Sequence, residues 1–250
     1  MRTLSSLPIC LLFLAGSCAF LPQTVRFSGS PPVTGGEPVN LTGILAKPEG
    51  NGPFPAIVLL HGAGGINQER DAAWARRLGR WGYVTLQVDS FRPRGVARVV
   101  GTPFRVAFLA RAQDAHDAKA YLAGLPFVAP GEIGVMGWSH GGITTLYAVD
   151  ELAGPLHGDG PFRAGVAFYP ACRRPLDGLE APVLILIGEK DDWTPASRCV
   201  DNMPAGKTSH EVLLTVYPGA FHDFDWEGLD TYSAGHRVKF DAAAAADAVA

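Results

Sequence analysis

A serine stands between two glycines in the stretch GWSHGG, from Gly137 to Gly142, where an apolar run gives way to residues typical of a helix. A serine hydroxyl is a weak nucleophile until a base removes its proton, and that base needs a carboxylate to fix its tautomer. Gly137 and Gly141 permit a sharp strand-to-helix turn that would hold Ser139 in a strained conformation with its hydroxyl projecting. The G-x-S-x-G pattern therefore predicts a nucleophile, if an acid and a histidine converge on it.

Acids and a histidine follow the serine at the ends of two later apolar runs, in GEKDDWTP and YPGAFHDFD. The order serine, acid, histidine is the one expected of an α/β-hydrolase. We predict His222 as the base, because four other histidines fall in helical patterns or polar loops; these are His116, His157, His210 and His236. Either Asp191 or Asp192 would be the acid, since adjacent side chains point in different directions and cannot share the role.

Attack on a carbonyl also requires two hydrogen-bond donors for the oxyanion, each worth roughly 10²–10³ in rate. The backbone N–H of His140 is the first candidate, because His140 directly follows the nucleophile. The second is expected in the glycine-rich loop HGAGG, where we favour the amide of Ala63, with Gly62 as the alternative.

The HGAGG loop does not fit a dinucleotide site, because Asn67 stands where the third glycine of G-x-G-x-x-G belongs. A metal site is also poorly supported: the chain has no H-E-x-x-H and no Cys/His ligand spacing, although His222, Asp223 and Asp225 could be imagined as ligands. We therefore expect no cofactor and no metal.

The elements that would position these residues alternate along the chain. Short apolar runs alternate with segments of helical period; the runs are PAIVLL, YVTLQV, IGVMG, AGVAFY, PVLILI and EVLLTV, and the helical segments are DAAWARRLGRW, FLARAQDAHDAKAYLAGL and GHRVKFDAAAAADAV. Apolar runs without polar alternation are typical of strands covered on both faces. The pattern predicts a three-layer α/β fold with a mostly parallel sheet, preceded by two strands around VRF and VNLTGIL. Ligands bind such sheets beyond the carboxyl ends of the strands, where the candidate residues stand.

Composition favours one globular domain without a polyanionic partner. The chain has 250 residues, of which 47% are hydrophobic and 18% charged, enough for one sizeable core over residues 20–250. The net charge of −3 provides no basic face, so nucleic acid is not expected to bind.

The N-terminus has the pattern of a secretory signal peptide over residues 1–19. Arg2 precedes the apolar stretch LPICLLFLAG, and Ser17 and Ala19 frame a small-residue cleavage site. The stretch is shorter than the roughly 20 residues that span a bilayer, so no stable membrane span is expected. The protein is predicted to be periplasmic or secreted, with lipid anchoring through Cys18 as the alternative.

Export would leave Cys172 and Cys199 in an oxidising compartment. We predict that they form a disulfide. The alternative is two separate buried thiols, because free cysteine behaves as a small hydrophobic residue.

Four spaced motifs resemble the dienelactone hydrolase branch of the α/β-hydrolases: HGAGGIN, GWSHGG, the G-x-x-D-x-x-x-P pattern from Gly188 to Pro195, and YPGAFHDFD. Carried over by position, the resemblance implies Ser139 as nucleophile, Asp191 as acid and His222 as base, with Ala63 and His140 as oxyanion donors. The enzymes that give the family its name use a cysteine nucleophile. The serine here resembles that of carboxylesterases of the same branch, which cleave small esters or lactones through an acyl-enzyme.

The expected function is that of an exported serine hydrolase whose partner is a small-molecule ester or lactone. A peptidase or acyltransferase with the same triad, and a non-catalytic binding module on the same fold, are the alternatives. Substrate contacts are predicted from Arg92 and Arg94, in the longest loop, and from Trp138 and Trp193, which flank the catalytic candidates in the sequence. Solvated or structural arginines and core tryptophans are the alternatives to that prediction.

Overall fold

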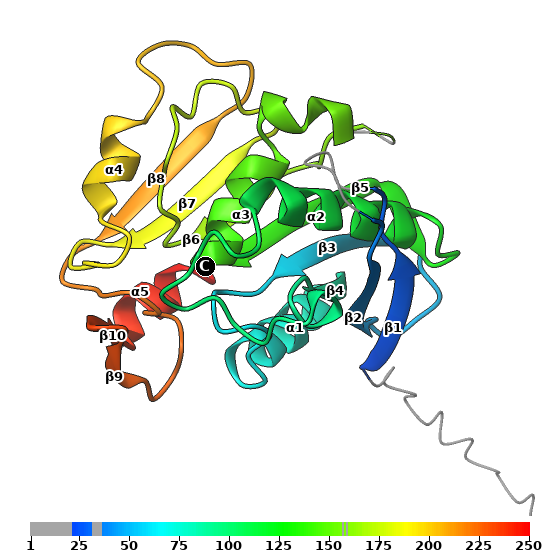
Figure 1. Ribbon diagram of the computed structural model, residues 1–250, viewed down its shortest axis with the longest axis horizontal. Coiled ribbons are helices and arrows are strands. Elements are labelled where there is room, and N and C mark those ends of the chain that lie inside the picture. Colours follow the sequence, from blue (N-terminus) through cyan, green and yellow to red (C-terminus); the bar gives the residue numbers. More distant parts are fainter. Residues whose placement is uncertain (1–21, 32–36, 157, 159) are drawn as a thin grey trace, which may run out of the picture.

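The computed structural model describes residues 22–31, 37–156, 158 and 160–250 (Figure 1). The predicted signal peptide, Cys18 and His157 lie outside the described residues. The strands are β1 (Gln23–Ser28), β2 (Asn40–Ala46), β3 (Phe54–Leu60), β4 (Val84–Asp89), β5 (Val128–Trp138), β6 (Gly165–Phe168), β7 (Val183–Gly188), β8 (Val212–Tyr217), β9 (Asp230–Ser233) and β10 (His236–Lys239). The helices are α1 (Arg70–Arg80), α2 (Phe108–Ala123), α3 (His140–Ala148), α4 (Ala196–Asp201) and α5 (Ala242–Asp247), with 3-10 turns at Arg92–Arg94 and Glu151–Leu156.

Eight strands form one mixed sheet in the order β1-β2-β4-β3-β5-β6-β7-β8. β1, β2 and β4 pair antiparallel, and every pairing from β4 through β3 to β8 is parallel. The predicted three-layer α/β fold with a mostly parallel sheet is therefore confirmed. The six apolar runs identified in the sequence form strands β3 to β8, and the six residues of β4 are all buried.

Helices cover both faces of the sheet, with α1 on one side and α2 and α3 on the other (Figure 1). The strand order explains this placement: the chain moves from β3 outward to β4, then back past β3 to β5, so the right-handed crossovers fall on opposite faces. On α1, the buried stripe contains Trp74, Ala75 and Leu78, and this helical spacing places Arg76 and Arg80 on the outer face. None of the helices in the described part of the chain is long and apolar enough to cross a bilayer.

The C-terminal segment differs from its prediction as one helix over GHRVKFDAAAAADAV. Its first part is strand β10, which forms a hairpin with β9 through a turn where Gly235 has φ 88°. The helix begins only after Asp241, whose carboxylate accepts hydrogen bonds from the amides of Ala243 and Ala244. Pairing with a neighbouring strand overrode the helical pattern, and His236 lies in the hairpin instead of a helix.

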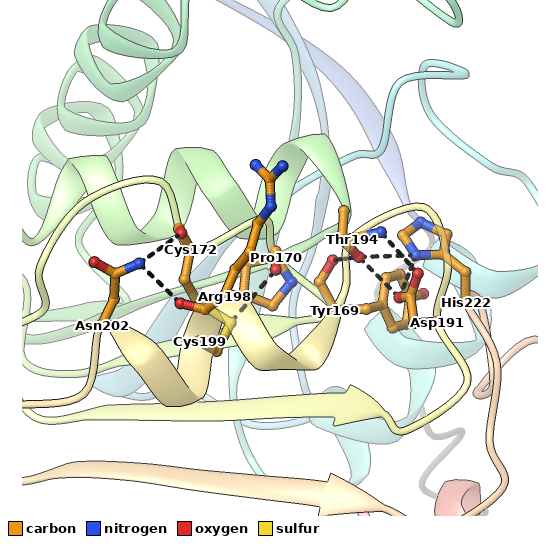
Figure 2. The surroundings of a disulfide bond; sticks show 9 residues. All are labelled: Tyr169, Pro170, Cys172, Asp191, Thr194, Arg198, Cys199, Asn202 and His222. Carbon is orange, nitrogen blue, oxygen red and sulfur yellow. Dashed lines mark hydrogen bonds and ion pairs between the residues drawn. A yellow bond between two sulfur atoms is a disulfide. The ribbon is translucent and has the colours of Figure 1, made fainter.

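Cys172 and Cys199 form a disulfide that links the loop after β6 to α4 (Figure 2). The strands that precede these two positions, β6 and β7, are neighbours in the sheet. The side-chain Nδ2 of Asn202 donates to the carbonyl of Cys172 at 3.2 Å, which connects the end of α4 to the same loop.

Candidate active site

Ser139 occupies the junction between β5 and α3 with φ 53° and ψ −113°, a region that non-glycine residues rarely adopt. Glycines make this turn possible. A Cβ atom on Gly141 would lie 1.9 Å from the carbonyl oxygen of Leu60, and one on Gly137 would lie 2.3 Å from that of Gly141. The turn is packed directly against the end of β3, so the G-x-S-x-G spacing is required by backbone contact.

Ser139, His222 and Asp191 lie in one hydrogen-bonded chain, although they are far apart in the sequence. The Oγ of Ser139 is 2.9 Å from Nε2 of His222, and Nδ1 of His222 is 2.6 Å from Oδ2 of Asp191. His222 is held from behind by the β9–β10 hairpin, because its carbonyl accepts a hydrogen bond from the amide of Lys239. The three side chains therefore meet at the carboxyl edge of the sheet.

The loop that follows β7 orients Asp191 through its own backbone (Figure 2). Oδ1 of Asp191 accepts from the amides of Trp193 and Thr194, and the Thr194 hydroxyl lies 2.8 Å from Oδ2. Asp192, the alternative candidate for the acid, contacts a different histidine. Its side chain is 58% exposed and faces His236, because Asp191 itself accepts the loop amides.

The buried His222–Asp191 pair shifts both ionisation equilibria. Burial opposes a charged His222, but the adjacent Asp191 carboxylate outweighs it and raises the pKa of His222 above its ordinary value. Burial likewise opposes a charged Asp191, but His222 and the Thr194 hydrogen bonds outweigh it and lower the pKa of Asp191. The arrangement therefore favours an ionised carboxylate beside a histidine that can accept a proton.

A cavity of about 260 Å³ opens on Ser139 and His222. It is lined on one side by the HGAGG loop, including Gly62 and Ala63. Within the described residues, neither the amide of Ala63 nor that of His140 has a hydrogen-bond acceptor. Two free amides from the two predicted positions are thus available beside the serine.

Only one of the four predicted substrate contacts lies at this cavity. Trp193 lines it and packs against His222, with ring centroids 5.1 Å apart and the ring planes tilted by 37°. Trp138 is fully buried and donates from Nε1 to Asp225, so its prediction as a pocket residue is wrong. Its position as the last residue of β5 points it into the core, opposite to the turn that exposes Ser139.

The two predicted arginines are also placed elsewhere. Arg94 makes a two-pronged ion pair with Asp114 and donates to the carbonyl of Ser90. Arg92 is largely exposed, with its side chain 70% accessible and 3.5 Å from Asp89. Neither arginine lines the cavity at Ser139. Arg94 instead connects its loop to α2 through the ion pair with Asp114.

Arg70, at the start of α1, lines the cavity and was missed in the sequence. Its guanidinium is buried and binds Asp71 at 3.0 Å and Asp223 at 2.8 Å. It also donates to the hydroxyl of Tyr169, which in turn donates to Asp225. In the sequence Arg70 stands directly before the helical segment DAAWARRLGRW, where a solvated arginine is the usual expectation.

This network occupies the acids that could be imagined as metal ligands. Asp223 is paired with Arg70, and Asp225 accepts from Tyr169, Trp74 and Trp138. In the described ranges, no group of three or more His, Cys, Asp or Glu side chains has the geometry to hold a metal ion.

Comparison with known proteins identifies the family. The model of the dienelactone hydrolase family matches residues 41–250, which is most of the chain. The chain belongs to the dienelactone hydrolase family. It is a hydrolase of this family, as the four spaced motifs implied.

Similar proteins include relatives of two kinds. The chain is 23% identical to "Putative carboxymethylenebutenolidase" of Synechocystis sp. over 229 residues, 84% of this chain and 88% of that protein. It is 35% identical over 94 residues to "Probable dipeptidyl-aminopeptidase B" of Grosmannia clavigera, where the match spans 36% of this chain but only 9% of that protein.

A dienelactone hydrolase from Anabaena variabilis has a similar solved structure. It aligns with a TM-score of 0.61 at 23% identity, covering 83% of this chain and 90% of that one. This likeness supports the same α/β fold for the aligned part of the chain.

Proposed function

We propose that this dienelactone hydrolase family member is an exported serine hydrolase that cleaves a small carboxylic ester or lactone through an acyl-enzyme. The observation that carries the proposal is the unbroken chain from Ser139 Oγ through His222 to Asp191, with separations of 2.9 and 2.6 Å. The Ser139–His222 distance is short enough for proton transfer in acylation and in deacylation, and the His222–Asp191 hydrogen bond holds the imidazole in position.

In the first step, Ser139 Oγ attacks the carbonyl carbon while His222 Nε2 takes the hydroxyl proton. The carbonyl oxygen becomes an oxyanion, which the amides of Ala63 and His140 stabilise. Asp191 stabilises the positive imidazolium without taking its proton. When the tetrahedral species collapses, His222 gives the proton to the leaving alkoxide and Ser139 keeps the acyl group.

In the second step, His222 removes a proton from water, whose oxygen attacks the acyl carbon. Collapse of the second tetrahedral species returns the proton to Ser139 and releases the acid. A lactone follows the same path, but its leaving alkoxide stays attached to the acyl group. The cavity of about 260 Å³ accommodates a small substrate and favours short acyl and alcohol groups.

Export is supported by the sequence pattern of residues 1–19 and by the Cys172–Cys199 disulfide, since such bonds persist in oxidising compartments. Fractionation of the host cell tests it directly. Recovery of the chain with residues 1–19 still attached, in the cytosol, would contradict the proposal.

The test of the chemistry uses a fluorophosphonate probe and a panel of chromogenic short-chain esters. Labelling at one site and ester turnover are both expected, and Ser139→Ala should abolish labelling and lower turnover by about 10⁶. Labelling that survives this substitution would remove Ser139 as the nucleophile.

A peptidase or acyltransferase is the second candidate, favoured by the local likeness to the Grosmannia clavigera protein named as a dipeptidyl-aminopeptidase. Aminoacyl amides tested beside the esters separate the two. Preferential cleavage of the amides would replace the esterase assignment while leaving the same three residues in their roles.

A further inference from the structure

Arg111 is a fully buried arginine on α2 that lies behind the candidate active site. Its guanidinium joins two segments that are remote in the sequence. Nη1 is 2.6 Å from Nδ1 of His140, and Nη2 donates to the carbonyl oxygen of His61 at 2.9 Å. These are the two segments that carry the proposed oxyanion donors, the amides of His140 and Ala63.

The hydrogen bonds of the His140 ring fix its orientation. Its Nε2 lies 2.8 Å from the carbonyl of Pro103, which can only accept, so Nε2 carries the proton. Nδ1 is therefore the acceptor for Arg111. Burial, followed by the charge of Arg111, lowers the pKa of His140 to about 3, so the ring stays neutral and keeps this tautomer. The ring is thus used to hold the residue in place, while its backbone N–H remains without an acceptor.

The HGAGG loop is anchored in the same way. The amide of Ser90 donates to Nε2 of His61, so Nδ1 bears the proton and lies 2.8 Å from the carbonyl of Gly62. The amide of Val99 donates to the carbonyl of Ala63 at 2.8 Å. With Arg111 on the His61 carbonyl, three consecutive carbonyls of this loop, at residues 61 to 63, have partners, and the Ala63 amide is left for the cavity.

Arg111 holds this position without a carboxylate bonded to it. Asp114, one turn along α2, is bound by Arg94 through both oxygens at 2.8 Å. Burial lowers the pKa of Arg111 to about 9, which still leaves it cationic at neutral pH. A buried cation held only by neutral acceptors is costly, and an apolar side chain of similar length would fill the same space more cheaply. What an apolar side chain of that size could not provide is the pair of hydrogen bonds from Arg111 to the segments of His140 and His61.

We propose that Arg111 is a positioning residue that sets the separation between the two oxyanion donors. This inference rests on the proposed function, because it assigns a role in the same site. One rigid planar fork reaches both segments, so the donors are held at a fixed spacing before the substrate carbonyl arrives.

The experiment compares Arg111→Met and Arg111→Lys with the wild type. Turnover is normalised to the number of sites labelled to completion by the fluorophosphonate. The second measurement is the affinity of a short-chain trifluoromethyl ketone, whose carbon is attacked by Ser139 Oγ as the proton moves to His222 and the ketone oxygen becomes an oxyanion. This adduct needs both donors, whereas binding of the intact ester does not.

For Arg111→Met, we expect kcat and the ketone affinity to fall together by about 10- to 10²-fold, less than the loss of a whole donor. KM should stay within about threefold, because ground-state binding is retained. For Arg111→Lys, kcat and the ketone affinity should lie between those of the wild type and those of Arg111→Met. The flexible ammonium group of lysine keeps the charge but cannot bond both segments as the planar guanidinium does. A lower melting temperature with unchanged kcat per site and unchanged ketone affinity would overturn the proposal.

His116→Leu is the matched control, because His116 connects α2 to the opposite end of α3. Its Nε2 lies 2.9 Å from the carbonyl of Ala148, the last residue of α3. This variant should lose stability but keep kcat and ketone affinity. An equal kinetic loss in His116→Leu would overturn the positioning role, because any loosening of α2 against α3 would then suffice.

If Arg111→Met does not fold, Arg111→Lys and His140→Leu decide the matter. His140→Leu keeps the backbone amide but removes the ring that Arg111 holds, so it should also lower kcat and ketone affinity. Unchanged kcat and ketone affinity in either folded variant would contradict the proposal. So would the failure of Arg111→Met, Arg111→Lys and His140→Leu to fold when His116→Leu does fold.

Ser139→Ala, measured in parallel, separates this inference from the proposed function. If Ser139→Ala retains turnover, the esterase mechanism itself fails.

Discussion

Asp192 Oδ1 lies 3.3 Å from Nδ1 of His236 on the β9–β10 hairpin, while the preceding Asp191 lies 2.6 Å from His222. Two adjacent acids therefore face two different histidines. Asp191→Asn should lower kcat by about 10⁴, because the amide cannot hold the tautomer of His222 that accepts a proton. Steady-state kinetics on the purified variant, with circular dichroism to verify folding, provide the measurement.

Asp192→Asn is the control for that substitution. Its contact with His236 is partly exposed, so the loss of this contact should change the free energy of unfolding by about 0–1 kcal/mol and leave most of the activity. A variant pair with the opposite behaviour would assign the acid to Asp192.

The pH dependence of kcat/KM should report the ionisation of His222. The residue acts as a base only when neutral, and Asp191 raises its pKa. Activity should therefore be lost as pH falls through an inflection above the ordinary histidine value of about 6.5. In Asp191→Asn the raising cause is gone and burial remains, so the inflection of the residual activity should move to lower pH. An unmoved inflection would indicate that another group titrates.

Gly141→Ala should disrupt the turn that presents Ser139. The added Cβ would meet the carbonyl of Leu60 at 1.9 Å, and backbone has little freedom to withdraw. We expect a loss of stability of about 3 kcal/mol or more, together with loss of probe labelling. Gly79→Ala, on α1 with nothing within 4 Å of its Cβ, should instead stabilise by about 0.5–1 kcal/mol. Chemical denaturation of both variants measures the difference, and equal effects would show that the backbone contact is unimportant.

Reduction of the Cys172–Cys199 disulfide should destabilise the domain. The bond closes a loop with a sequence separation of 27, for which the chain-entropy account gives about 3.5 kcal/mol. Thermal unfolding with and without reductant should show this loss in the wild type and no reductant effect in the double variant Cys172→Ser/Cys199→Ser. Mass spectrometry that finds two free thiols in protein from its oxidising compartment would contradict the bond.

The tryptophans on either side of the site should separate packing from substrate contact. Trp138→Phe removes a donor to the buried Asp225 and should cost about 1–3 kcal/mol of stability with little change in KM. Trp193→Ala should instead change KM and the preference among ester chain lengths, because Trp193 lines the cavity. A chain-length series with both variants tests this, and a preference that follows Trp138 would reverse the assignment.

The fold class, and the edge of the sheet at which chemistry-bearing residues gather, could both be predicted from the amino-acid sequence. Both follow from local pattern: uninterrupted apolar runs such as β4 require cover on two faces, and the residues that end parallel strands share one edge. The role of the glycines around Ser139 could also be predicted, because the geometry of a tight turn depends on a few consecutive residues.

Some of the side chains that meet at that edge could not be predicted, because they are brought together by contacts between segments remote in the sequence. Trp138 and Ser139 are adjacent in sequence, yet one enters the core and the other faces the cavity. Arg70 and Arg111 look like ordinary helical arginines until segments far along the chain give them Asp223 and His140 as partners. The β9–β10 pairing likewise replaced a helical pattern with a hairpin that supports His222. Such contacts join residues whose separation in sequence has no characteristic spacing, so burial and long-range pairing fix them, and no local pattern encodes them.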